Sequence, residues 1–310
     1  MADGTRHPQS DSSDHAMTAA ETTEADTADV EVPEQQTDQT PLVRLDSVMR
    51  TYGGIPVLDR ATLSILPGLT AVIGPNGSGK STLLRTLAGV TVPTKGAIHR
   101  SVSGINSSRA SSETTIDGRE NTPVEGRKRI GYLPQQVPFR SGFTARETLA
   151  FYARFVDADP EAALASIGLE DAGDRRVEAL SGGMTRLLGI AQATLGDPQL
   201  VVLDEPASGL DPGMRERAFD TAAAHADERT AVVVSSHDLE LVDAYADTVV
   251  ALNKGSVVAS GPLDRLKETH EAETTRELYR SLVGSSAVDT AMADDASKPN
   301  RVHVTGVSER

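Results

Sequence analysis

The sequence predicts an α/β fold built around a mostly parallel sheet. Three short apolar runs, Leu69–Ile73, Leu200–Leu203 and Ala231–Ser235, have the length and composition of buried strands. Segments with the apolar spacing of helices stand between them. Buried strands that alternate with helices are typical of a parallel sheet covered on both faces, and 310 residues with 38% hydrophobic content suffice to build its core.

The N-terminal part of the folded region has a different pattern. Residues 42–68 alternate apolar and polar side chains in short runs broken by YGG and PG, which predicts an antiparallel β subdomain. Residues 80–88 are predicted to be a helix. A serine-rich stretch at about 99–114 has no periodicity, so we expect an inserted loop there.

The second half returns to alternating elements. Residues 149–169 and 182–195 have helical spacing, and we expect an inserted α-helical subdomain at about 136–196. Helices at 214–226 and 238–245 then alternate with strands, the last of them within 247–260.

The net charge of −15 is concentrated in the N-terminal tail. Residues 1–41 carry ten acidic side chains against one arginine and few aromatic residues, so we expect them to be disordered. Residues 284–310 are expected to be disordered too, which leaves a folded domain at 42–283 with a charge of about −5.

Several classes of protein are excluded by composition. There is no cysteine, which excludes disulfides and thiolate chemistry. No apolar run reaches the roughly 18 residues of a membrane helix, and the N-terminus lacks a secretory signal, so we expect the protein to stay where it is made. The acidic balance and the lack of a basic stripe argue against nucleic acid as a partner.

A glycine-rich loop follows the first buried strand. The sequence GPNGSGKST matches the phosphate-binding motif G-x-x-x-x-G-K-[S/T] in its required context, between a strand and a helix. Its backbone N–H groups can surround phosphates, Lys80 can reach the β- and γ-phosphates, and Ser81 can ligate Mg²⁺. A glycine-rich turn without function is the less favoured alternative. The candidate nucleotide-binding residues are Gly74, Pro75, Asn76, Gly77, Ser78, Gly79, Lys80, Ser81 and Thr82.

Polar side chains follow two other predicted strands. Asp204 and Glu205 come directly after one strand, and His237 follows the next. Parallel strands deliver such residues to the edge of the sheet where ligands bind, so Asp204 is expected to hold Mg²⁺ and Glu205 to polarise the attacking water. His237 and Gln135 are expected near the γ-phosphate, the water or the metal. Read alone, each of these residues is more often structural than functional, and the neighbouring glycine-rich loop is what favours the functional interpretation.

A second candidate anion site lies at LSGGM, residues 180–184. Ser181 is a good N-cap, Gly182 and Gly183 leave N–H groups unobstructed, and apolar residues anchor the helix behind them. A simple capped helix start is the alternative, and on this stretch alone it is the favoured one.

Together these residues resemble the nucleotide-binding subunits of ABC transporters over about 42–261. The order of motifs is that family's order: Tyr52 before the P-loop, Gln135 in the Q-loop, the signature 180–183, the Walker B strand ending at Asp204 with Glu205 after it, the D-loop 208–211, and the switch residue His237. The resemblance implies a RecA-like P-loop NTPase core. It also implies ATP and Mg²⁺ as cofactors.

The resemblance implies a role for each matching residue. Tyr52 stacks on adenine, Glu205 is the catalytic base, His237 and Gln135 sense the γ-phosphate, and Asp211 crosses a dimer interface. In a head-to-tail dimer, Ser181, Gly182 and Gly183 close over ATP held by the partner's P-loop. The catalytic set is then Glu205, His237, Gln135 and Lys80, and the metal ligands are Ser81, Gln135 and Asp204.

The partners implied by the resemblance are a transmembrane permease and a second copy or a related ATPase subunit. The permease contact is expected around residues 142–155, which places the protein on the cytoplasmic face of the cell membrane. The segment 181–206 is most similar to ATPases of ABC-2-type exporters, although Met184 and Ala207 replace the residues usual at their positions. A soluble ABC ATPase of DNA repair or translation is the main alternative, and a P-loop kinase or binding module is disfavoured by the signature and D-loop.

Overall fold

The computed structural model describes residues 40–101, 113–117 and 130–284. All described residues belong to one compact unit. The predicted tails at 1–41 and 284–310 lie outside the described residues apart from three residues at their inner ends. Their disorder therefore stays a prediction.

Four strands form an antiparallel sheet in the order β2-β1-β4-β5. They are β1 (Val43–Tyr52), β2 (Ile55–Ile65), β4 (Lys95–Ser101) and β5 (Glu113–Asp117). This sheet confirms the predicted antiparallel subdomain. The loop predicted at 99–114 was wrong at both ends, because His99 pairs with Thr115 and Ser101 with Glu113 across β4 and β5. Pairing between the strands supplies backbone hydrogen bonds that cannot be predicted from a side-chain pattern. The rest of the predicted loop, residues 102–112, lies outside the described part.

Six strands form the second sheet in the order β10-β9-β3-β8-β7-β6. They are β3 (Gly68–Ile73), β6 (Ile130–Leu133), β7 (Leu200–Leu203), β8 (Ala231–Ser235), β9 (Thr248–Asn253) and β10 (Ser256–Pro262). All neighbours are parallel except β9 and β10, which confirms the predicted mostly parallel sheet. Every residue of β7 and β8 is buried, which explains their continuous apolar sequences.

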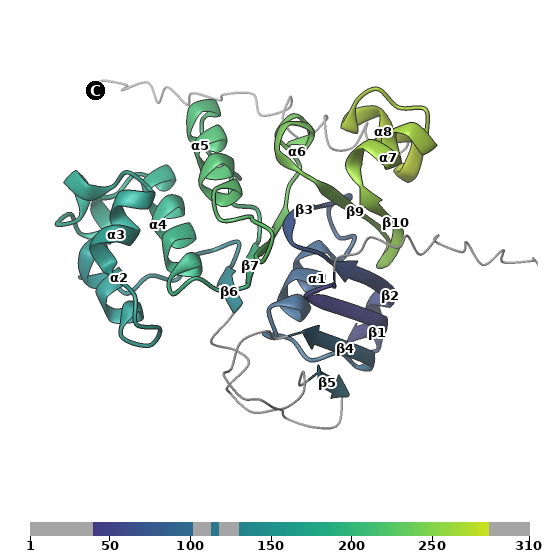
Figure 1. Ribbon diagram of the computed structural model, residues 1–310, viewed down its shortest axis with the longest axis horizontal. Coiled ribbons are helices and arrows are strands. Elements are labelled where there is room, and N and C mark those ends of the chain that lie inside the picture. Colours follow the sequence, from purple (N-terminus) through teal and green to yellow (C-terminus); the bar gives the residue numbers. More distant parts are fainter. Residues whose placement is uncertain (1–39, 102–112, 118–129, 285–310) are drawn as a thin grey trace, which may run out of the picture. The chain divides into compact units, whose positions relative to one another are not determined.

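Helices flank this sheet, and several of them lie in the stretch of chain that connects β6 to β7 (Figure 1). They are α1 (Lys80–Leu87), α2 (Ala145–Ala153), α3 (Pro160–Ser166), α4 (Gly182–Thr194), α5 (Pro212–Ala223), α6 (Leu239–Tyr245), α7 (Leu263–Thr269) and α8 (Thr275–Val283), with the short 3₁₀ turns η2 (Glu170–Ala172) and η3 (Val177–Ala179). Between β6 and β7 the described elements are all helical, and α2, α3 and α4 group together there.

The helix predicted at 149–169 is two helices. The first begins earlier, at Ala145, because Thr144 and Glu147 form a reciprocal capping box. The second begins at Pro160, which is favoured in the first turn but cannot continue a helix, and Asp159 caps it by accepting from the N–H of Glu161. Apolar spacing alone did not separate the two.

Other elements were not predicted. The edge strand β6 has four residues, three of them only half-buried, so its sequence has no strand pattern. The terminal helices α7 and α8 follow β10 and pack on each other. Helix α7 also packs on β10, and α8 packs on α6 and β9. Thr274 and Glu277 close a second capping box at the start of α8.

Helix α4 lies unusually close to the edge strand β6. A side chain added to Gly131 of β6 would place its Cβ 1.6 Å from the carbonyl oxygen of Ala193 in α4. At Gly189 of α4, an added Cβ would lie 2.6 Å from a methyl carbon of Leu133. These two glycines therefore allow the backbone of α4 to approach the sheet.

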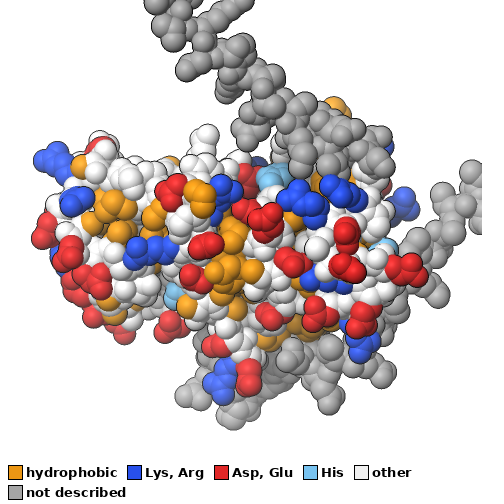
Figure 2. Space-filling model, turned by 90° about the horizontal axis from the view of Figure 1, so that it is seen from above, with side chains coloured by type: hydrophobic (Ala, Val, Ile, Leu, Met, Phe, Trp, Pro, Cys, Tyr) orange, Lys and Arg blue, Asp and Glu red, His pale blue; other side chains and the backbone are white. Residues whose placement is uncertain are grey.

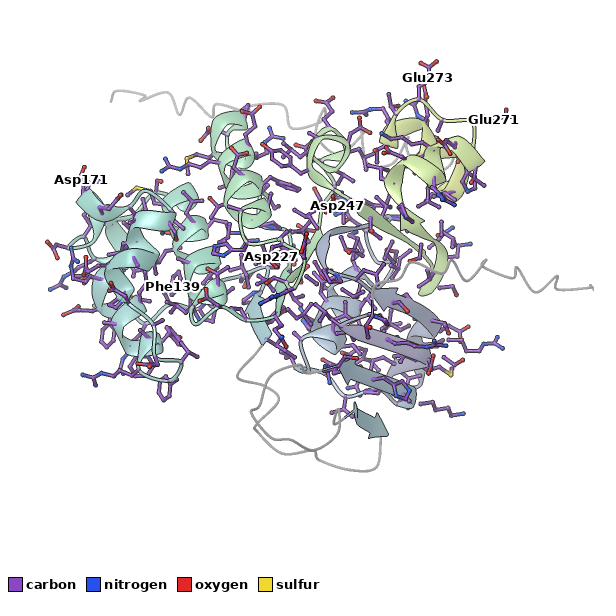
Figure 3. All side chains as sticks on the ribbon, in the orientation of Figure 1. Phe139, Asp171, Asp227, Asp247, Glu271 and Glu273 are labelled. Carbon is purple, nitrogen blue, oxygen red and sulfur yellow. The ribbon has the colours of Figure 1, made fainter. Side chains whose placement is uncertain are left out.

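Side chains of the helical region and of the second sheet share one hydrophobic core (Figure 3). Phe139, in the connection after β6, packs against that core. Asp247 accepts a 2.7 Å hydrogen bond from the N–H of Leu69 and so fixes the start of β3. No helix in the described ranges is long and apolar enough to cross a membrane.

Candidate functional site

The glycine-rich loop connects β3 to α1 through three residues with positive φ. These angles are 154° at Gly74, 78° at Gly77 and 102° at Gly79. Gly79 is the N-cap of α1 and has no side chain to bond the free N–H groups, so these groups stay available to an anion. The hydroxyl of Ser78 is buried and has no hydrogen-bond partner in the described structure. A phosphate oxygen would be a suitable acceptor for this hydroxyl and for the free N–H groups of the loop.

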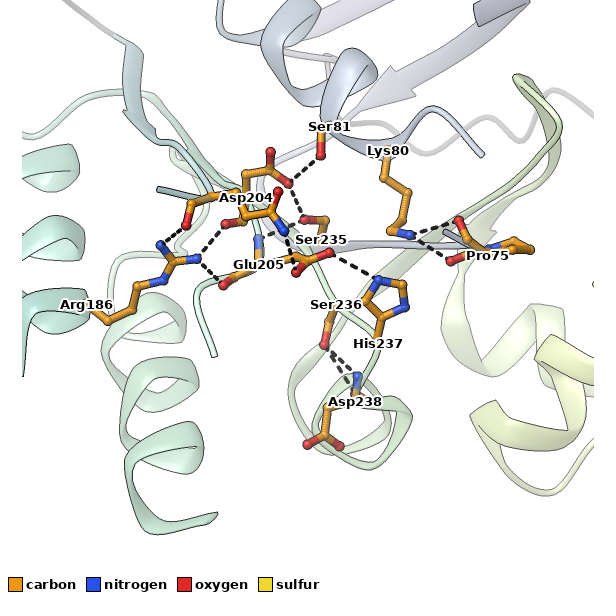
Figure 4. A network of polar contacts seen from close by, with 12 residues as sticks. Pro75, Lys80, Ser81, Arg186, Asp204, Glu205, Ser235, Ser236, His237 and Asp238 are labelled. Carbon is orange, nitrogen blue, oxygen red and sulfur yellow. Dashed lines mark hydrogen bonds and ion pairs between the residues drawn. The ribbon is translucent and has the colours of Figure 1, made fainter. Parts of the chain in front are cut away.

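Lys80, the first residue of α1, is 6% exposed. Its Nζ lies 2.8 Å from the carbonyl oxygen of Gly74 and 3.1 Å from that of Pro75, so the loop itself orients the ammonium group (Figure 4). Burial lowers the pKa of Lys80, and the charges of Glu205 and Asp204 oppose that effect. The lysine is thus a cation held beside two carboxylates.

Asp204, directly after β7, is 1% exposed. Its Oδ1 accepts hydrogen bonds from the hydroxyl of Ser81 at 3.1 Å and from that of Ser235 at 2.8 Å. Its Oδ2 is buried without a partner in the described structure. An unpartnered carboxylate oxygen beside a serine hydroxyl is a donor set that Mg²⁺ prefers, so these residues fit a magnesium ion.

Glu205 is held at both carboxylate oxygens (Figure 4). Its Oε1 lies 3.1 Å from Nε2 of His237, and its Oε2 accepts a 3.2 Å hydrogen bond from Nε2 of Gln135. The hydrogen bond with His237 is the largest cause that holds the pKa of Glu205 below its usual value, and partial burial opposes it. The side chain is therefore ionised at neutral pH and has a fixed orientation.

The backbone of Glu205 is also unusual. Its φ of 51° lies in the left-handed region, which residues other than glycine seldom adopt. Its N–H donates to the hydroxyl of Ser235 at 2.9 Å, and its carbonyl oxygen accepts from the guanidinium of Arg186 in α4. Sequence reasoning missed both Ser235 and Arg186, since a serine at the end of a strand and an arginine in a helix give no signal.

Tyr52, at the end of β1, is 42% exposed. The guanidinium carbon of Arg50 lies 4.6 Å from the centre of its ring, and Arg50 is tied to the carbonyl oxygen of Val92 at 2.9 Å. Burial raises the pKa of Tyr52, but hydrogen bonds with Arg50 and Thr91 outweigh it, and the net pKa is lowered. The ring is thus an accessible aromatic surface supported by a cation.

The signature residues form a separate group. Ser181 caps α4 by accepting from the N–H of Met184 at 3.2 Å, as predicted, and its carbonyl oxygen accepts from the hydroxyl of Thr185. Both bonds stay within its own helix. Ser181 and Gly182 are exposed, and nothing lies within 4 Å of the position of a Cβ added to Gly182. Met184 packs, half-buried, against the hydrophobic core.

The predicted site residues therefore fall into two sets. The members of the first set are joined by hydrogen bonds or by close charges; they are Lys80, Ser81, Gln135, Asp204, Glu205 and His237. Ser181 and Asp211 instead cap helices, since Asp211 accepts from the N–H of Met214 at 3.1 Å at the start of α5. A cleft of about 600 Å³ adjoins Glu205 and His237, and it is lined in addition by residues 207–210 and by Arg215 and Arg276.

The comparisons with known proteins agree with this geometry. Residues 58–208 match the family described as ABC transporter. The chain is 37% identical to the zinc import ATP-binding protein ZnuC of Paracoccus denitrificans over 81% of this chain and 88% of that protein. It is 32% identical to the Nod factor export ATP-binding protein I of Mesorhizobium japonicum over 86% of this chain and 73% of that protein.

A solved structure of the ATP-binding subunit of an ABC transporter is also similar. It superposes with a TM-score of 0.65 at 25% identity, over 78% of this chain and 99% of that one. The chain thus belongs to the ATP-binding proteins of ABC transporters and is an ATPase of that family.

Proposed function

We propose that two copies of this chain, or one copy and a related ATPase subunit, close head to tail around two ATP molecules. The observation that carries this proposal is the division of the site residues into two sets. The signature start at Ser181 is an exposed helix N-terminus whose hydrogen bonds stay within α4, while the P-loop has its own lysine and carboxylates. A second phosphate-binding element that is not used by its own chain is available to another chain.

Within each site, the residues of one chain divide the work. Lys80 and the loop N–H groups bind the phosphates, while Tyr52 stacks on adenine. Ser81, Asp204 and Gln135 hold Mg²⁺, which neutralises charge that develops on the phosphates. The unpartnered Oδ2 of Asp204 supports this assignment.

Glu205 is the proposed general base for the attacking water. Its lowered pKa keeps the carboxylate ionised, and a carboxylate can accept a hydrogen bond from water and orient it. His237 and Gln135 fix the carboxylate from both sides, and each can exchange that bond for one to the γ-phosphate or the metal. Asp211 crosses to the other chain in the closed dimer.

A cluster of aromatic side chains supports the proposed permease contact within 142–155. The ring of Phe151 meets those of Phe143, Tyr152 and Phe155 edge to face, at centroid distances of 5.3 to 6.5 Å. Phe151 is 43% exposed and Phe155 is 63% exposed. Exposed apolar clusters of this kind mark interaction surfaces. We propose that a membrane permease covers it, which holds the ATPase on the cytoplasmic face of the membrane.

Export is the proposed direction, on the similarity of residues 181–206 to ABC-2-type exporter ATPases. Relatives of both directions match this chain. ZnuC and the hemin import ATP-binding protein HmuV of Rhodococcus jostii are named as importers, and the Nod factor protein is named as an exporter. Identification of the permease that co-purifies with the chain tests the proposal. A permease that works with an external binding protein contradicts export.

Replacement of Glu205 by Gln tests the proposed dimer. We expect ATP hydrolysis to fall by roughly 1,000-fold or more while ATP binding remains, because the base is lost and the phosphate contacts are kept. Unhydrolysed ATP then holds two chains together, and size exclusion with ATP detects the dimer. Glu228→Gln changes an exposed carboxylate and is the control for charge. A Glu205→Gln protein that binds ATP and stays monomeric contradicts the head-to-tail dimer.

A further inference from the structure

Arg186 is a buried cation to which neither the family resemblance nor the proposed function above assigns a role. It lies in α4 and is 7% exposed. Burial lowers its pKa, against the charges of Asp204 and Glu205. A buried guanidinium group loses its hydration, so it is stable only where its N–H groups find acceptors.

The acceptors of Arg186 are five main-chain carbonyl oxygens on two loops. Figure 4 shows its bonds to Asp204 and Glu205. On the Q-loop, Nη1 donates to Gln135 at 2.7 Å and to Pro134 at 3.2 Å. After β7, Nη2 donates to Asp204 at 2.9 Å and to Glu205, and Nε donates to Pro206 at 3.2 Å. The planar fork of one arginine therefore joins the loops that carry Gln135 and Glu205.

These hydrogen bonds hold Glu205, the residue with the least favourable backbone conformation in the site. Glu205 has a φ of 51°, and such a conformation persists only where its surroundings fix it. The hydroxyl of Ser235 holds the N–H of Glu205, and Arg186 holds its carbonyl oxygen. Removal of Arg186 leaves five buried or partly buried carbonyl groups without this donor, and the chain can relax toward an ordinary φ.

We propose that Arg186 is a positioning residue, which sets the carboxylate of Glu205 and the amide of Gln135 by fixing their main chains to helix α4. It does not touch the nucleotide. Because Gly131 and Gly189 let α4 pack closely against β6, the helix is a rigid support for this fork. The proposal rests on the proposed role of Glu205 as the base.

Arg186→Met and Arg186→Lys test the proposal in the full chain with ATP and Mg²⁺. Methionine keeps most of the volume and removes the donors, and we expect kcat to fall by roughly 100-fold while KM changes by less than about three-fold. Lysine keeps the charge but lacks the fork, so a partial loss of roughly 10-fold is expected. A purely structural role would not produce this separation of kcat from KM or the partial rescue by lysine.

Two controls sharpen the result. Arg217→Met removes another arginine that donates to main-chain carbonyls, at 3.0 Å to Ile167 and 3.4 Å to Gly168, and it should keep kcat within about three-fold of the wild type. In a Glu205→Gln background, Arg186→Met should cause a clearly smaller loss than it does alone, since the part of its effect that acts through the Glu205 carboxylate is already gone.

Three outcomes overturn the proposal: a folded Arg186→Met protein with kcat within about three-fold of the wild type, an equal loss in Arg217→Met, or a full additional loss in the Glu205→Gln background. A circular-dichroism melt checks folding, and if Arg186→Met is unfolded at the assay temperature, Arg186→Lys carries the same test. Failure of the proposed function is distinguishable, because Glu205→Gln itself then keeps its turnover.

Discussion

Two helix starts in this protein share glycine-rich sequences and differ in their surroundings. Helix α1 begins after Gly79, which has no capping side chain, and its first residue is the buried Lys80. Helix α4 begins after Ser181, whose hydroxyl caps the N–H of Met184, and its first residue, Gly182, is exposed. The same local chemistry, free N–H groups at a helix N-terminus, is present at both.

The difference shows that a phosphate-binding element is complete only when its neighbours are included. Around α1, the chain's own sheet supplies Asp204, Glu205 and His237. Ser181 makes its hydrogen bonds within α4, and Gly182, the first residue of that helix, faces open space. On the face that Figure 2 shows, acidic and basic side chains are interspersed over the middle of the molecule, while acidic ones gather along the lower left edge. The starts of α1 and α4 therefore differ mainly in the burial of their residues, since both have glycine-rich sequences.

The largest effect on this comparison is expected from Ser181→Arg. A long cation at the exposed start of α4 obstructs the phosphates that a partner chain would present, so kcat should fall by roughly 100-fold or more. The ATP affinity of the monomer should not change, because Ser181 lies outside the chain's own site. Steady-state ATPase assays and titration of the monomer with a fluorescent ATP analogue measure the two quantities.

Ser181→Ala is the matched control, since it removes the cap without adding bulk. We expect it to lower the free energy of unfolding by about 1 kcal/mol and to lower kcat much less than arginine does. A large loss of monomer ATP affinity in Ser181→Arg would assign the signature to its own chain's nucleotide and remove the basis of the comparison.

A pair of glycine replacements is expected to have the next largest effect. Gly79→Ala forces a side chain into a φ of 102° and places its Cβ 2.6 Å from the carbonyl oxygen of Val57. We expect the free energy of unfolding to fall by about 2–4 kcal/mol and ATP binding to be lost. Gly182→Ala meets open space, so the same free energy should change by less than about 0.5 kcal/mol. Urea denaturation of both variants measures the difference, and equal losses would contradict it.

The smallest expected effect concerns the pH dependence of hydrolysis. The hydrogen bond from His237 is the main cause of the low pKa of Glu205, and a base must be ionised to work. Wild-type kcat/KM should therefore persist down to a low pH, and in His237→Ala the pKa of Glu205 rises, so the acid limb should move to higher pH. The pH profile of the residual activity measures this shift. An acid limb that stays in place, or moves to lower pH, contradicts the assigned cause.

Particular residues show how far the sequence could lead. The P-loop, the run Leu200–Leu203 and the signature were readable because each has a local pattern, and the structure confirms their strand and helix contexts. The edge strand β6 and the end of the helix at Ala153 were not readable, because pairing with β7 and the start of a new helix at Pro160 decide them. The roles of all the site residues, Gln135 and Tyr52 included, stay predictions.

The sequence by itself determined the α/β class, the order of the motifs and the residue types proposed to bind phosphate and magnesium, since these depend on local periodicity and on side-chain chemistry. Only the tertiary structure decided which of those residues meet. It placed Glu205 between His237 and Gln135 and left one oxygen of Asp204 unpartnered. It also brought the guanidinium of Arg186 within hydrogen-bond distance of the loops that carry Gln135 and Glu205. These relations join residues between 19 and 70 positions apart, and no local pattern encodes them because strand order and close helix packing create them.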